Sequence, residues 1–188
     1  MKYPVFFLLL LLSGCEKLTA TPPLQQYPHV AQGSYAAALS DDARYAAVSS
    51  IQDGVALWDL QNNALKYQWK HQDSSDNLVF SLAISHNNSH VLTADQHNYA
   101  LWSTASGENI GFWQLDAATV RDVAVSDNGA HLLIGKSNGG VQHITLASGR
   151  RLEFLGHTER INSVAMSPNG RYALTGGNDY KAHLWDTQ

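Results

Sequence analysis

The sequence has little cysteine, little charge and only one long apolar run, and each of these shortages excludes a class of protein. Its single cysteine excludes a disulfide within the chain. Charged residues make up 15% of the 188 residues, 44% are hydrophobic and no long charge run occurs, which argues against disorder over most of the chain. A formal net charge of −4 with dispersed lysines and arginines offers no basic stripe to displace counterions, so we expect no nucleic-acid partner.

The one long apolar run lies at the N-terminus. Lys2 gives it a positive start, residues 3–12 are apolar, and Ser13, Gly14 and Cys15 follow at once. This run is too short for a helix that spans a bilayer, which takes about 20 residues. The pattern therefore predicts a signal peptide over residues 1–14 and not a transmembrane segment.

The segment Leu12-Ser13-Gly14-Cys15 resembles the lipobox of bacterial lipoproteins. The resemblance implies cleavage before Cys15, a diacylglycerol on its sulfur and a further acyl chain on its new amino group. Three acyl chains exceed the two membrane signals that stable anchoring requires. The alternative is an ordinary signal peptide that leaves Cys15 as an incidental free thiol.

The residue after Cys15 indicates in which membrane the lipoprotein is anchored. In the lipoprotein family an Asp directly after the cysteine commonly retains the protein in the inner membrane, and here that residue is Glu16. The resemblance therefore implies the outer membrane of a Gram-negative envelope, facing the periplasm. Residues 15–33 are polar and contain three prolines, which predicts a tether between the lipidated cysteine and the folded body.

The rest of the chain carries a four-fold repeat. A serine that ends an apolar stretch recurs, and a tryptophan or an isoleucine follows each one 17 or 18 residues later; the pairs are Ser40 with Trp58, Ser85 with Trp102, Ser126 with Ile144, and Ser167 with Trp185. We call these the landmark serines and landmark tryptophans. Successive serines lie 45, 41 and 41 residues apart. A period in the low forties is the size of one four-stranded propeller blade.

Each unit also shows strand and turn signals. The stretches that end at the landmark serines are short and rich in apolar and β-branched residues; they cover 35–39, 79–84, 120–125 and 161–166. Hairpin residues follow every one of them, such as Asn169 and Gly170 in the last unit. The sequence therefore predicts an all-β protein with about four propeller blades over residues 34–188.

The landmark tryptophans carry a resemblance to the WD-repeat β-propellers. Leu57-Trp58-Asp59 and Leu184-Trp185-Asp186 match the signature tripeptide of that family, Leu101-Trp102-Ser103 is a weakened copy, and His143-Ile144-Thr145 has lost it. In such blades a histidine, a serine, an aspartate and a tryptophan form a buried hydrogen-bonded chain. The resemblance carries these roles to His157, Ser163, Asp179 and Trp185. Only this last unit has the complete set. In the other units Gln52, Gln96 and Asn138, or the neighbours Asp53 and Asp95, take the approximate place of the aspartate.

The same residue types suggest two kinds of chemistry that we weigh against this structural role. His157, Ser163 and Asp179 are the components of a hydrolytic triad, but a buried network in which each polar group has a partner stiffens a blade and explains them. His86 and His90 lie four residues apart, yet they flank a turn and have no carboxylate between them. We therefore expect no catalytic residue, no metal site and no cofactor.

The number of blades leaves three arrangements open, because the resembling family usually has seven. The chain is the N-terminal portion of a longer or interrupted propeller, or two copies build an eight-bladed ring as a homodimer, or four blades close alone. In the last arrangement residues 24–27 supply the outer strand of the final blade, which prolines tolerate at a sheet edge.

For function, the resemblance implies a non-enzymatic scaffold that binds a protein of the cell envelope over the rim of one propeller face. Leu78, Thr119 and Arg160 share one rim position when the units are aligned by the landmark serines. An alternative is a propeller enzyme, for example a lactone hydrolase, or a binder of a small ligand in the central channel. Either would need carboxylates or histidines that converge from several blades. A further alternative is a truncated propeller without independent function.

Overall fold

The computed structural model describes residues 21–24, 26, 33–72, 78–116 and 118–188. The predicted signal peptide, Cys15 and most of the predicted tether lie outside the described residues. Within the described part the chain forms fifteen strands and no helix. None of the described segments is a helix of the length and apolarity that crossing a membrane would require.

The strands form four antiparallel sheets in sequence order, which we call blades 1 to 4. Blade 1 contains β1 (Ser34–Leu39), β2 (Tyr45–Ser50), β3 (Val55–Asp59) and β4 (Ala64–Trp69). Blade 2 contains β5 (Ser81–Ile84), β6 (His90–Ala94), β7 (Asn98–Ser103) and β8 (Asn109–Gln114). Blade 3 contains β9 (Val120–Val125), β10 (His131–Lys136), β11 (Val141–Thr145) and β12 (Arg150–Phe154). Blade 4 contains β13 (Ile161–Met166), β14 (Tyr172–Gly177) and β15 (Ala182–Asp186).

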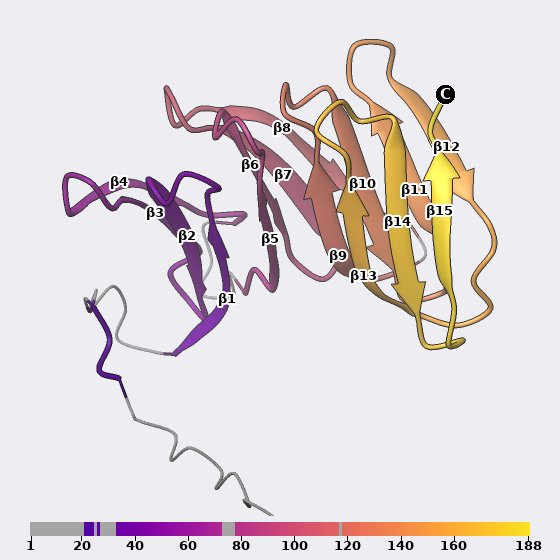
Figure 1. Ribbon diagram of the computed structural model, residues 1–188, viewed down its shortest axis with the longest axis horizontal. Helices are drawn as coiled ribbons and strands as arrows, with labels where there is room; N and C mark the ends of the chain where they lie inside the picture. Colours follow the sequence, from indigo (N-terminus) through magenta and orange to yellow (C-terminus); the bar gives the residue numbers. More distant parts are fainter. Residues whose placement is uncertain (1–20, 25, 27–32, 73–77, 117) are drawn as a thin grey trace, which may run out of the picture.

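The blades stand side by side in the order of the sequence (Figure 1). Their first strands meet along the inside, because β5 contacts both β1 and β9, and β9 contacts β13. Blade 1 lies at one end of the resulting arc and blade 4 at the other (Figure 1). The prediction of an all-β fold with four propeller blades is confirmed. The described residues of one copy form an open arc of blades and not a closed ring (Figure 1).

The landmark serines close the turn between the first and second strands of every blade. In blade 1 the Ser40 Oγ accepts a hydrogen bond from the Tyr45 N–H at 2.8 Å and donates to Asp42 at 2.8 Å. Ser85, Ser126 and Ser167 make the equivalent pair of bonds in blades 2, 3 and 4. A hydroxyl that both donates and accepts fixes the turn, which is why the serine recurs.

Three apolar clusters hold neighbouring blades together. Side chains in a strand point alternately to the two faces of its sheet. Blades 2 and 3 therefore bury one set of side chains against the preceding blade and the other set against the following blade. We call the side of a blade that packs on the next blade its forward face and the opposite side its rear face. Forward-face residues meet rear-face residues in each cluster: Leu57 with Val91, Leu92 with Val125, and Leu133 with Met166.

The predicted closing strand, residues 24–27, is described only at Leu24 and Gln26. Neither of them belongs to a strand, and the Leu24 side chain is fully exposed. Gln25 and Tyr27 lie outside the described residues. In the described part of the chain, blade 4 therefore has three strands where the other blades have four.

Candidate functional site

A buried hydrogen-bonded chain crosses blade 4. His157 contacts Asp179 through Nδ1 at 2.8 Å and the Thr175 hydroxyl through Nε2 at 2.9 Å. The Trp185 indole N–H donates to the same hydroxyl at 2.9 Å. Burial disfavours the charged form of Asp179, but hydrogen bonds from His157 and from backbone N–H groups outweigh it and lower the pKa of the carboxyl.

One member of this chain differs from the sequence prediction. The hydroxyl that joins the histidine to the tryptophan belongs to Thr175, whose residue is fully buried in the centre of β14. Ser163, to which the sequence assigned this role, is an exposed residue of β13. The correction has a geometric reason, because Thr175 lies on the strand paired with the strand of Trp185, whereas Ser163 lies on the far side of β14.

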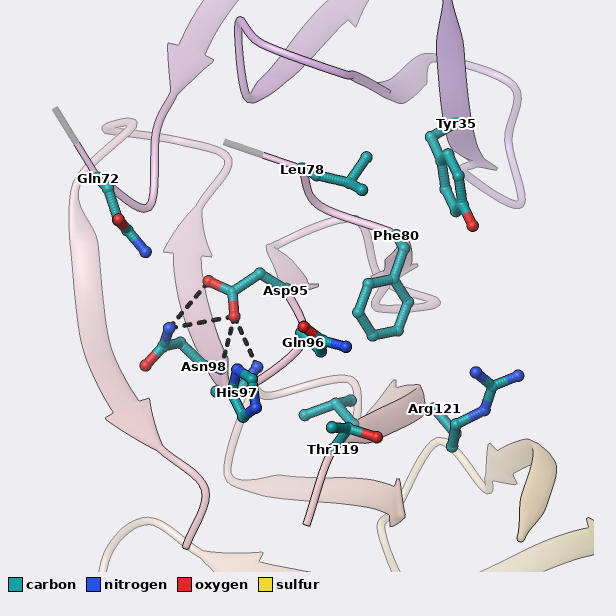
Figure 2. Close-up of a pocket in the computed structure, with 11 residues that line it drawn as sticks. Tyr35, Gln72, Leu78, Phe80, Asp95, Gln96, His97, Asn98, Thr119 and Arg121 are labelled. Atoms are coloured by element: carbon teal, nitrogen blue, oxygen red, sulfur yellow. Dashed lines mark hydrogen bonds between the residues drawn. The ribbon is translucent and has the colours of Figure 1, made fainter. Parts of the chain in front are cut away.

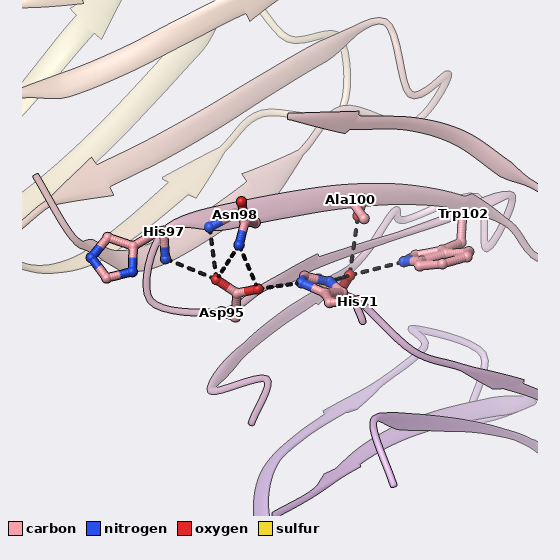
Figure 3. Close-up of polar contacts among 7 residues, drawn as sticks. His71, Asp95, His97, Asn98, Ala100 and Trp102 are labelled. Carbon is pink, nitrogen blue, oxygen red and sulfur yellow. Dashed lines mark hydrogen bonds and ion pairs between the residues drawn. The ribbon is translucent and has the colours of Figure 1, made fainter. Parts of the chain in front are cut away.

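A second complete chain crosses blade 2 (Figure 3). His71 contacts Asp95 through Nδ1 at 2.8 Å and the Thr93 hydroxyl through Nε2 at 2.7 Å. The Trp102 indole N–H donates to Thr93 at 2.8 Å. Burial of Asp95 opposes its ionisation, yet hydrogen bonds from His71, Asn98 and the His97 backbone lower its pKa to about 2.

The sequence prediction that only the last unit has a complete set is therefore wrong. Thr93 and Thr175 both stand eight residues after their landmark serines, and this shared position was the available signal. The histidine was missed because His71 lies 14 residues before its landmark serine and His157 only ten. Four additional residues between histidine and serine moved His71 out of register.

Neither of the two hydrogen-bonded chains has a group left free to react with a substrate. In each, both ring nitrogens of the histidine already have protein partners, and the threonine hydroxyl is buried. Ligand atoms of His157, Asp179 and His183 lie within 4.8 Å of one another, as in a metal site. Two of these three residues are held in the blade 4 chain, so a metal ion would have to displace existing hydrogen bonds.

The described residues do form a pocket, at the rim where loops enter the inner strands of blades 1, 2 and 3 (Figure 2). Its volume is about 500 Å³. We call it the rim pocket; it is lined by Tyr35, Gln72, Leu78, Phe80, Asp95, Gln96, His97, Asn98, Thr119, Val120 and Arg121. Of the three rim residues taken from the sequence, Leu78 and Thr119 line this pocket, and Arg160 does not.

Three further lining residues of this pocket were not predicted from the sequence. Tyr35, Phe80 and Arg121 each stand five residues before the landmark serine of their blade. They are therefore equivalent residues of three successive blades, and the serine alignment contained the signal for them. Their chemistry differs, since two are aromatic and the third is a cation.

Hydrogen bonds fix part of the lining of the rim pocket, and one of its sides is apolar. The Val120 N–H donates to the Gln96 carbonyl at 3.0 Å, and Thr119 and Ser137 exchange backbone and side-chain hydrogen bonds. Leu78 and Phe80 lie on one side of the pocket, and Arg121 lies at another edge (Figure 2). Asp95 is the carboxylate of the lining, and the second hydrogen-bonded chain holds it in place.

Comparisons with known proteins agree with this architecture. Residues 149–186 match the family model "WD domain, G-beta repeat". That range begins just before β12 and ends with β15, so it spans the outer strand of one blade and the three strands of the next. The chain is also 27% identical, over 145 residues that make up 76% of it, to the WD repeat-containing protein SL1-17 of Schistosoma mansoni. It spans about half of that relative, since the match covers 47% of the relative's length. In one matched repeat, in this relative and in its four antiparallel sheets, the chain is therefore similar to WD-repeat proteins.

Proposed function

We propose that this chain is a lipid-anchored interaction scaffold that binds a segment of an envelope protein in the rim pocket. WD-repeat proteins typically act as protein-interaction scaffolds, and the rim pocket is the feature that carries the proposal here. Three successive blades contribute equivalent residues to it, so a bound segment touches several blades at once. Rigid, preorganised contacts of this kind cost little conformational entropy on binding.

The lining indicates the chemistry of the bound segment. Leu78 and Tyr35 expose large apolar surfaces, and Phe80 beside them is half-buried. An apolar side chain placed there removes apolar area from water on both partners. Arg121 is exposed at the edge of the pocket and offers a planar donor group. The bound protein segment therefore offers an apolar side chain to Leu78 and Tyr35 and a carboxylate to Arg121.

The proposed anchor rests on the sequence. Cys15 follows the apolar run at the lipobox position, and residues 16–33 provide a polar linker between membrane and blades. In the proposal the acylated Cys15 holds the blades at the periplasmic face of the outer membrane of a Gram-negative cell. The partner is then a protein of the same envelope, within reach of the tether.

Binding is favoured over catalysis because Asp95, the carboxylate of the pocket lining, is already held by other groups of the fold. Asp95 accepts hydrogen bonds from His71, Asn98 and a backbone N–H, which holds it ionised and oriented. A general base needs a free lone pair within reach of the substrate proton. The rim pocket therefore presents a recognition surface and lacks a nucleophile paired with a base among its described residues.

The test compares positions inside and outside the pocket. A photo-crosslinking side chain at residue 78 in intact cells should capture one envelope protein, which mass spectrometry identifies. The double variant Leu78→Asp/Arg121→Glu should lose that partner in pull-down, because it places charge on the apolar side and reverses the cation. Arg160→Glu is the matched control, since Arg160 is an exposed rim arginine outside the pocket.

Two results would overturn the proposal. Unchanged capture by the folded double variant would mean that the partner uses another surface. Turnover of a lactone substrate that survives repurification, and that the double variant abolishes, would mean that the pocket is an active site.

A further inference from the structure

Blade 4 exposes an apolar forward face. Leu174 of β14 and Leu184 of β15 are 49% and 72% exposed, and Tyr172 beside them is also exposed. A shallow depression lies among these residues. Exposed apolar side chains gathered on one face of a sheet are typical of an interaction surface.

The repeat shows what such a face contacts. Leu174 stands seven residues after its landmark serine, as Leu92 and Leu133 do, and both of these are fully buried in the clusters between blades. Leu184 directly precedes its landmark tryptophan, as Leu57 and Leu101 do, and these two are buried as well. The forward face of every other blade is therefore covered by the rear face of a blade.

A polar group on the same face points to the same kind of contact. Four residues before the landmark serine, blade 2 carries Ser81 and blade 3 carries Asp122. The Ser81 hydroxyl accepts a hydrogen bond from the Val123 N–H of the next blade at 3.2 Å. The Asp122 carboxylate accepts one from the Val164 N–H of the next blade at 2.8 Å. Both bonds tie the inner strand of one blade to the inner strand of the next.

Ser163 occupies this position in blade 4. Its residue is exposed, and it takes no part in the hydrogen-bonded chain of Trp185. Its hydroxyl therefore stands where the two preceding blades hold an acceptor for the backbone of a following inner strand. A contact of this kind gives a role to Ser163, which is not part of the hydrogen-bonded chain of blade 4.

Blade 1 exposes the complementary rear face. Leu39, directly before its landmark serine, is 62% exposed, whereas its equivalents Val125 and Met166 are buried between blades. Ala37 is exposed as well, and it stands at the position of Val123 and Val164, the two donors to a preceding blade. Within the described residues, the forward face of blade 4 and the rear face of blade 1 are thus the two blade faces that no other blade covers.

We propose that two copies of this chain join head to tail, with the forward face of blade 4 of each copy packed on the rear face of blade 1 of the other. In this contact Leu174 and Leu184 pack against Leu39, and the Ser163 hydroxyl accepts a hydrogen bond from the Ala37 N–H. The contact repeats the three interfaces within the chain. Each copy uses one patch as donor face and a different patch as acceptor face, so two copies form a closed ring when each contact turns the chain by half a revolution. The four described blades of each copy then give eight, within the range of known propellers.

The first experiment measures the mass of the full chain in a mild detergent by sedimentation, with the detergent subtracted. The wild-type protein should have the mass of two copies, and Leu174→Asp/Leu184→Asp should have the mass of one. Ile110→Asp is the matched control, because Ile110 is 47% exposed but lies on the outer strand of an inner blade; it should stay dimeric. A monomeric wild-type protein, or an assembly larger than two copies, would overturn the proposal.

The second experiment distinguishes the head-to-tail contact from pairing of like faces. Leu39→Asp should also give a monomer by itself, since it damages the rear face of blade 1. A mixture of Leu39→Asp with Leu174→Asp/Leu184→Asp should form mixed dimers, because one of the two contacts then joins an intact forward face to an intact rear face. A dimeric Leu39→Asp protein, or a mixture of two folded variants that stays monomeric, would contradict this geometry.

Discussion

Thr93 and Thr175 hold equivalent places in blades 2 and 4, where each hydroxyl bonds a histidine ring on one side and a tryptophan indole on the other. Both threonines are fully buried. The two histidines each reach on to an aspartate, so a four-membered chain ties the loop before a blade to its second and third strands. In blades 1 and 3 the equivalent positions are Val48 and Ile134, which offer no hydroxyl.

Replacing this hydroxyl should destabilise the blade. Thr175→Val keeps the shape of the side chain but leaves the ring nitrogen of His157 and the indole N–H of Trp185 without a partner in a buried place. Such orphaned groups cost about 1–3 kcal/mol. Denaturant unfolding measures the change, and Thr158→Val, at an exposed position, serves as the control and should stay within about 0.5 kcal/mol of the wild-type protein. Equal effects of the two substitutions would show that the hydrogen-bonded chain does not stabilise the fold.

His143 should make the stability fall in acid. Burial, with the nearby His131 and Arg150, lowers the pKa of His143 to about 4. The unfolded chain binds a proton at His143 near pH 6.5, whereas the folded chain binds it only near pH 4. The neutral ring therefore contributes its full share to the free energy of unfolding above about pH 6.5, and this contribution declines as the pH falls toward 4. His143→Leu, which restores the residue found before the landmark tryptophan in the other blades, should flatten the decline.

The measurement for His143 is the free energy of unfolding at several values between pH 7 and pH 4. A shallower slope should remain in the variant, because burial also lowers the pKa of His90. An unchanged slope in His143→Leu would assign the acid sensitivity to other groups.

Ala43 should be a site where glycine stabilises the protein. It has φ 55°, in the left-handed region, and it stands at the turn position of Gly129 and Gly170, which have φ 67° and 74°. A side chain in that region costs roughly 1–2 kcal/mol, so Ala43→Gly should raise the free energy of unfolding by about 1 kcal/mol after the entropy lost by glycine. The reverse change, Gly170→Ala, adds the same strain and brings a Cβ against the His131 ring. It should lower the denaturant midpoint; a gain there would refute the turn argument.

Cys15 should be the site of lipid attachment. The lipobox resemblance predicts that labelled palmitate enters the wild-type protein and that Cys15→Ala removes both the label and the membrane association. Fractionation and autoradiography of the two proteins make the comparison, and Ser13→Ala, which keeps a small residue before the cysteine, should still be labelled. Labelling that persists in Cys15→Ala would end the lipoprotein hypothesis.

Much of the fold was predictable because its signals are local. A landmark serine, its turn partner and the residue with positive φ lie within six positions of one another, so the same turn leaves the same trace in every unit. Strand alternation is equally local, since it depends on the next residue but one. The last unit matches the repeat pattern most closely. Three of the four residues in its hydrogen-bonded chain, His157, Asp179 and Trp185, could therefore be predicted from the sequence.

The features that the sequence did not predict depend on contacts between residues far apart in the chain. His71 meets Asp95 across a connection whose length differs from that of the last unit, and the choice of Thr175 over Ser163 depends on which strands are paired. The rim pocket likewise arises only when Leu78, Thr119 and Arg121 are brought together from different blades.

The sequence by itself determined that this chain folds as four blades of short strands, because turn chemistry and side-chain alternation act over a few residues. Only the tertiary structure decided which faces are covered. Leu92 and Leu174 occupy the same position in their blades, yet one is buried and the other exposed. The difference comes from the neighbouring blade, which removes the apolar surface of Leu92 from water and leaves that of Leu174 open to a partner.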